Sequence, residues 1–99
     1  METDVYLSER VKQRLHRFPK PVLEKINSLP DPHATPSGRD WFSGRTLYVT
    51  TVSGWAITYR FVYEGCVGLN AMHAVLTVEA VERQPRARAR LSFHRRRVE

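Results

Sequence analysis

The stretch from Trp55 to Tyr63 alternates large apolar residues with smaller or polar ones, which is typical of a β-strand. Its large apolar residues stand at every second position: Trp55, Ile57, Tyr59, Phe61 and Tyr63. Because a strand points successive side chains to opposite faces, we expect these five to form one hydrophobic wall. The other face then carries Ala56, Thr58, Arg60, Val62 and Glu64. Such a wall needs a cover, so the pattern predicts helices over one face and an open face opposite.

A first helix is predicted directly after a short apolar strand at residues 5–7. Ser8 is a suitable N-cap, and Val11, Leu15 and Phe18 fall on one helical face at i, i+4 and i+7. Pro19 ends this helix, because proline lacks the amide donor that a helix interior needs.

A second helix is predicted between two prolines. Pro21 suits the first turn, Pro30 closes the segment, and Val22, Ile26 and Leu29 form its apolar face. The two helices therefore make a tight hairpin, whose apolar faces would cover the predicted wall.

Two further strands are predicted at about residues 46–52 and 74–83, with a Ser53-Gly54 turn leading into the strand that begins at Trp55. The order is β-α-α-β-β-β, which predicts an α+β fold with the helix hairpin packed on one face of a small, mainly antiparallel sheet. Prolines and glycines between Pro30 and Gly44 predict a long loop, and we expect Trp41 and Phe42 to hold it against the core.

Length and composition indicate one small soluble domain. The chain has 99 residues, 41% of them hydrophobic, and no apolar run near the roughly 20 residues that span a membrane. The first residues do not resemble a secretory signal, and a single cysteine, Cys66, fits a reducing compartment. We therefore expect a cytoplasmic protein without membrane contact.

Charge divides the chain into a domain at residues 1–83 and an arginine-rich C-terminal extension at residues 84–99. The first part has ten Lys/Arg and nine Asp/Glu, whereas the second has six arginines and one glutamate. These six are candidates for phosphate contacts: Arg86, Arg88, Arg90, Arg95, Arg96 and Arg97. This asymmetry points to an anionic partner, either nucleic acid or an acidic protein, although a solvated tail has the same composition. The extension fits an edge strand, a helix or a frayed end.

In the order of its segments, the chain resembles the RelE/ParE toxin superfamily of bacterial type II toxin–antitoxin modules. Five segments carry the resemblance, at residues 6–8, 15–26, 43–49, 53–59 and 78–83. They resemble the family's first strand and helix cap, its helix hairpin, the entry to its second strand, its central hairpin and its last strand. Together they cover most of residues 5–83.

The resemblance implies the toxin component of such a module, an RNA-directed translation inhibitor similar to the mRNA interferases. Arg83 matches the family's last-strand arginine, and Arg45 resembles the basic residue at the start of the second strand. Two positions depart from the ribonuclease pattern: Ala56 stands in place of an arginine, and Glu82 in place of a histidine. The chain would thus be at most a weakened endoribonuclease, since losing one charge donor costs about 10²–10³ in rate.

The remaining candidate groups follow from position. Arg60 lies four residues after Ala56, hence on the same face, and could replace the lost charge or pair with an acidic neighbour across strands. We expect Arg45, Arg60 and Arg83 to gather on the open face. His94 is the best candidate acid or base, because an imidazole exchanges protons near neutral pH, although it could also be a tail residue without a role.

Two other functions fit the same resemblance. One is a toxin similar to the ParE branch, which inhibits DNA gyrase through protein contact and lacks the ribonuclease residues. The other is a degenerate, non-catalytic binding module of the same fold. The expected partners are a cognate antitoxin and either mRNA with the ribosome or DNA gyrase. No metal-ligand spacing or phosphate-cradling glycine loop is present in the sequence, so we expect no cofactor.

Overall fold

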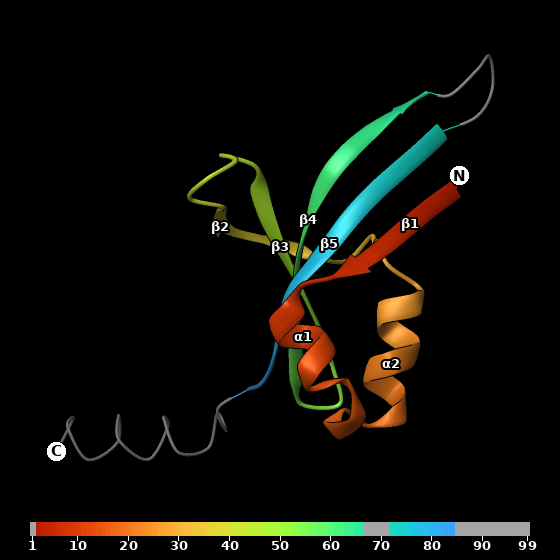
Figure 1. The fold of residues 1–99 in the computed structure, drawn as a ribbon, viewed down its shortest axis with the longest axis vertical. Coiled ribbons are helices and arrows are strands. Elements are labelled where there is room, and N and C mark those ends of the chain that lie inside the picture. The colour runs from red at the N-terminus through yellow and green to blue at the C-terminus, as the bar shows by residue number, and fades with distance from the viewer. Residues whose placement is uncertain (1, 67–71, 85–99) are drawn as a thin grey trace, which may run out of the picture.

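The computed structural model describes residues 2–66 and 72–84, which form a mixed α/β fold (Figure 1). In the described residues the elements are β1 (Glu2–Leu7), α1 (Glu9–Gln13), a 3₁₀ turn (Leu15–Arg17), α2 (Lys20–Asn27), β2 (Thr35–Arg39), β3 (Thr46–Val52), β4 (Trp55–Cys66) and β5 (Met72–Arg83). The strands make one five-stranded sheet in the order β1-β5-β4-β3-β2. β1 runs parallel to β5, and the other neighbouring strands are antiparallel.

The helical layer covers one face of the sheet near the β3–β4 turn (Figure 1). Val22 and Ile26 of α2 belong to the same buried apolar cluster as Ile57 and Tyr59 of β4 and Leu76 of β5. The prediction of apolar helix faces is thereby confirmed for α2. It also holds for the first helical segment, by which we mean α1 and the following 3₁₀ turn with its C-cap (residues 9–18). Val11 and Phe18 of this segment are buried.

Leu15 is the exception on the first helical face. Its side chain is 36% exposed, because α1 ends at Gln13 and the chain tightens into a 3₁₀ turn at Leu15. A 3₁₀ turn has 3.0 residues per turn instead of 3.6, so the side chain rotates away from the position that α-helical spacing gives it. The prediction of Leu15 as a core residue is therefore wrong.

A β-bulge at Val62 interrupts the alternation of β4. Phe61 pairs with Leu76 and Tyr63 with the adjacent Val75, so Val62 is an extra residue on β4. From this point the side chains change faces: Tyr63 lies on the open face with its ring 6.5 Å from that of His73. The predicted wall thus ends at Phe61, and the prediction is wrong for Tyr63.

The segment after Pro30 is more ordered than predicted. Its residues Thr35–Arg39 form β2, an edge strand that pairs with β3 despite Pro36 and Gly38. Proline is compatible with an edge strand because its missing donor costs no ladder bond there. Trp41 and Phe42 are 89% and 93% exposed, so the prediction that they hold the loop against the core is wrong.

Asp31 fastens the chain between α2 and β2 to the sheet. Its carboxylate pairs with the Lys25 ammonium at 2.9 Å and accepts a hydrogen bond from the Thr50 hydroxyl. Its backbone N–H donates to the Tyr59 hydroxyl at 3.2 Å. The Thr50 hydroxyl, followed by Lys25 and the backbone N–H of His33, holds the pKa of Asp31 far below its usual range.

None of the helices in the described residues has the length and apolar character needed to cross a lipid bilayer.

A candidate anion-binding groove

Arg45, Arg60 and Arg83, which we expected on the open face, do not come together. Arg60 does lie on that face, but its Nε contacts the Glu79 Oε1 at 2.7 Å. The side chains of this pair are only 24% and 29% exposed, so the carboxylate offsets the charge of Arg60 locally. The pKa of Asp40 is lowered chiefly by hydrogen bonds from Ser43, and Arg60 lies near enough to contribute to the same shift. Arg60 is therefore a paired residue, as the alternative interpretation of its position had it.

Arg83 lies on the other face of the sheet. It pairs across the ladder with Trp55, and its guanidinium carbon lies 5.6 Å from the centroid of the Trp55 ring. Trp55 in turn meets Phe18 of the helical layer edge to face, with centroids 5.6 Å apart. Since alternate residues of β4 point to opposite faces, Trp55 and Arg60 are on different faces, and Arg83 goes with Trp55.

Arg45 lies at the opposite end of the sheet from Arg83. It lines a small pocket with Tyr48, Phe61 and Glu64 just before β3 begins, whereas Arg83 lies beside the β3–β4 turn at the other end of β3. The expectation that Arg45, Arg60 and Arg83 converge is therefore wrong.

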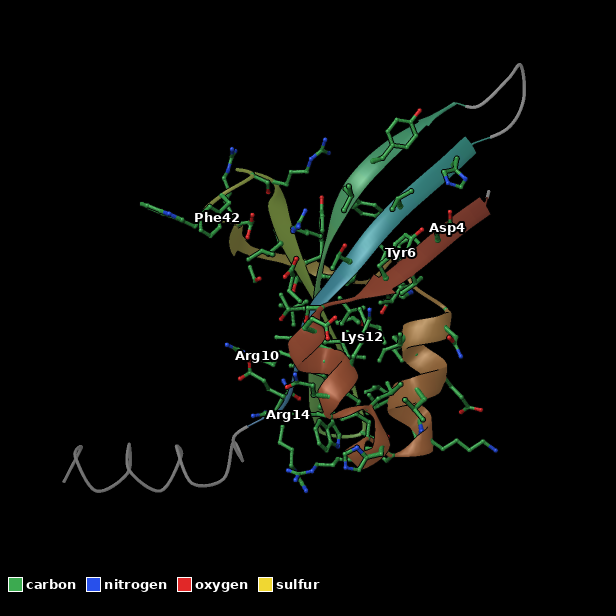
Figure 2. All side chains as sticks on the ribbon, viewed as in Figure 1. Asp4, Tyr6, Arg10, Lys12, Arg14 and Phe42 are labelled. Atoms are coloured by element: carbon green, nitrogen blue, oxygen red, sulfur yellow. The ribbon has the colours of Figure 1, made fainter. Side chains whose placement is uncertain are left out.

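A different set of arginines does gather, around a groove between the first helical segment and the end of β5. Two adjoining pockets of about 380 and 370 Å³ form this groove and share Arg14, Phe18, Val81 and Glu82. The groove is lined by Arg10, Val11, Arg14, Arg17, Phe18, Trp55, Ala80, Val81, Glu82 and Arg83. We call it the arginine groove. Figure 2 shows Arg10 and Arg14 on the side of α1 that faces away from α2.

Ser8 positions α1 against β5 and so builds one wall of the groove. Its N–H donates to the Val78 carbonyl at 3.0 Å, its hydroxyl donates to the Glu79 carbonyl at 3.3 Å, and the same oxygen accepts from the Val11 N–H. The N-cap is thereby fixed to the strand, and the first turn of α1 follows it.

The arginines of this wall recur at i, i+4 and i+7. Arg10 and Arg14 line the first pocket, and Arg14 and Arg17 line the second, so the three arginines lie along the same groove. They lie beside the buried side chains of Val11 and Phe18. This spacing is visible in the sequence, where the three arginines lie mostly off the apolar face of the predicted helix. No local sequence pattern indicates that Arg83 would line the same groove, because its place there depends on its cross-strand pairing with Trp55.

The groove is strongly cationic. In the described part of the chain, Arg10, Arg14, Arg17 and Arg83 form no ion pair. Glu82 is the one carboxylate among the lining residues of the two pockets. Guanidinium groups bind phosphate and carboxylate through two parallel hydrogen bonds, so four of them around an open groove favour an extended anion.

The groove has no arrangement for proton transfer. Its lining residues include no histidine, cysteine, lysine or tyrosine, and the carboxylate of Glu82 has no second acid or base beside it among them. No cluster of potential metal ligands occurs within residues 2–66 and 72–84. His94 and the six arginines of the C-terminal extension lie outside the described residues. The groove is therefore suited to binding and not to acid–base chemistry.

Comparison of the chain with models of protein families, with curated proteins and with solved structures found no match.

Proposed function

We propose that this chain is the toxin-like component of a toxin–antitoxin module, resembling RelE/ParE proteins, and that it inhibits translation by binding RNA without cleaving it. The order β-α-α followed by antiparallel strands supports the resemblance, with β2 as an additional edge strand. The arginine-rich extension supports an anionic partner for the chain. The single observation that carries the RNA-binding part is the arginine groove.

Phosphate binding follows from the charges of the groove. Arg10, Arg14, Arg17 and Arg83 have no carboxylate partner in the described part of the chain, so their guanidinium groups are available to a ligand. RNA presents one phosphate per nucleotide, and each neutralised phosphate releases counterions, which favours binding at low salt. The six arginines after residue 84 add further positive charge to the same chain.

The pairing of Arg60 argues against cleavage. A ribonuclease of this kind needs cations at the developing charge together with an acid and a base. Arg60 is held by Glu79, and Arg83 lies on the opposite face. We therefore propose a binding protein and not an endoribonuclease.

A second candidate is a gyrase inhibitor similar to the ParE branch. The same observation favours it, because that branch acts without a ribonuclease centre. In either case we propose a cognate antitoxin with an acidic segment, since carboxylates complement the arginine groove.

Cell-free translation with purified, antitoxin-free protein tests the proposal. We expect reduced protein synthesis while the mRNA stays intact on a gel. The double variant Arg14→Ala/Arg17→Ala should lose the inhibition, whereas Lys12→Ala/Lys20→Ala, which removes the same charge outside the groove, should keep it. Cleaved mRNA would contradict the binding mechanism. Normal translation combined with inhibited gyrase supercoiling would favour the second candidate.

A further inference from the structure

The turn between β2 and β3 exposes two adjacent aromatic side chains. Trp41 is 89% exposed and Phe42 is 93% exposed, more than the other large hydrophobic residues of the described chain. Figure 2 shows Phe42 at the outer end of this hairpin, away from α1 and α2. We call residues 39–45 the aromatic tip. Adjacent exposed aromatic residues are a feature of binding surfaces, because their contact with water is unfavourable.

Hydrogen bonds hold the aromatic tip in a defined shape. The Asp40 N–H donates to the Arg45 carbonyl and the Gly44 N–H donates to the Asp40 carbonyl, both at 2.8 Å. The Asp40 Oδ2 accepts from the Ser43 N–H at 2.9 Å and from the Ser43 hydroxyl at 2.8 Å. The Ser43 N–H, followed by its hydroxyl, holds the pKa of Asp40 below its usual value. The two rings are thus presented by a closed turn.

The charges at the aromatic tip favour an anionic ligand. Arg39 and Arg45 flank the two rings, and neither forms an ion pair within residues 2–66 and 72–84. Asp40 is the one carboxylate of the tip, and its Oδ2 is already occupied by Ser43. A ligand with planar apolar groups and regularly spaced negative charge matches this set of side chains.

We infer that the aromatic tip stacks against unpaired bases of single-stranded RNA, with Arg39 and Arg45 at the neighbouring phosphates. This inference rests on the proposed RNA-binding function and names its ligand class. Bases in a duplex are stacked on each other and offer no free face, whereas unpaired bases stack readily on aromatic side chains. The arginine groove would bind phosphates of either form, so the aromatic tip is the part that selects single strands.

The test compares binding of the 99-residue chain to a 20-nucleotide single-stranded RNA and to the same strand paired with its complement. Trp41→Ala should weaken single-strand binding by roughly 5- to 150-fold, the range found when one base-stacking ring is removed. It should leave duplex binding unchanged. Trp41→Phe, which keeps an aromatic ring, should retain most of the affinity. Ser37→Ala, an exposed change on the same hairpin, is the matched control and should bind as the unchanged protein does.

Four other results would overturn the inference in distinguishable ways. If Trp41→Ala binds single strands as well as the unchanged protein does, the tip is not a stacking site, although the RNA-binding proposal stands. If the unchanged protein binds neither RNA, both proposals fail. If anionic phospholipid vesicles, and not RNA, shift the Trp41 fluorescence to shorter wavelength, the tip is a membrane contact. Equal losses for both RNA forms would also contradict the inference.

Discussion

Arg60 and Glu79 form an ion pair on the open face of the sheet, with Nε and Oε1 2.7 Å apart. They lie on the neighbouring strands β4 and β5, and the bulge that lets Tyr59 pair with Val78 and Thr58 with Ala80 leaves Glu79 as an extra residue on β5. A ribonuclease centre on this face would need a free cation, and Arg60 is instead bound by Glu79. The open face is therefore not where the free positive charge of the described domain lies.

Removing the Arg60–Glu79 pair should affect stability and not RNA binding. We expect Arg60→Ala to lower the free energy of unfolding by about 1 kcal/mol, the upper end for exposed pairs, because both side chains are partly buried. Urea unfolding measures this change. RNA affinity should stay within a factor of two. A loss of affinity comparable to that of Arg14→Ala would show that Arg60 contacts RNA after all.

Neutralising the carboxylate in the arginine groove should strengthen RNA binding. Glu82 lines both pockets beside Arg14 and repels phosphates, so Glu82→Gln should raise affinity at low salt by a few-fold. The effect should fade as added salt screens the charges. The matched control is Glu24→Gln on α2, outside the groove, which should change affinity less. Equal effects of both substitutions would mean that only net charge matters.

The stabilising contribution of Asp31 should be lost in acid, so the free energy of unfolding should fall at low pH. Its pKa is lowered on folding, so its contribution is complete above the unfolded value of about 3.9 and is lost as the pH falls below that value. Asp31→Asn should lower the unfolding free energy near pH 7 by roughly 1.5–3 kcal/mol, because Thr50 and Lys25 lose a charged partner. It should also flatten the decline below pH 4. Chemical denaturation between pH 2 and pH 7 measures both, and an unchanged pH profile would contradict this role.

The β3–β4 turn has positive φ at both central residues, 50° at Ser53 and 81° at Gly54. This is the type I′ geometry, which favours Asn-Gly. Gly54→Ala should therefore destabilise the protein by about 1 kcal/mol, although a Cβ there meets no atom within 4 Å. Ser53→Asn should be neutral or slightly stabilising. Thermal unfolding distinguishes the two, and a fully stable Gly54→Ala protein would contradict the backbone explanation.

Local patterns predicted most of the elements, since apolar spacing at Val22 and Ile26 and the Ser53-Gly54 turn depend on near neighbours. The predictions were wrong where the structure depends on pairing between segments that are distant in the sequence. A bulge at Val62 turned Tyr63 to the open face, and pairing with β3 made an edge strand of Thr35–Arg39. The prediction that Arg45, Arg60 and Arg83 converge was wrong for the same reason. Arg83 joins the helix-side arginines because it pairs with Trp55, a register that no local pattern contains.

The most direct measurement of the central claim is the salt dependence of RNA binding for Arg14→Ala beside Lys12→Ala. Both residues lie on the first helical segment, and each substitution removes one positive charge. Arg14 lines both pockets, whereas Lys12 lies outside them, with its Nζ 3.9 Å from the Glu9 Oε1. If the arginine groove binds phosphates, Arg14→Ala lowers the slope of log affinity against log salt by about 0.7, and Lys12→Ala leaves it unchanged. Equal slopes for the two variants would contradict the groove as the RNA-binding surface.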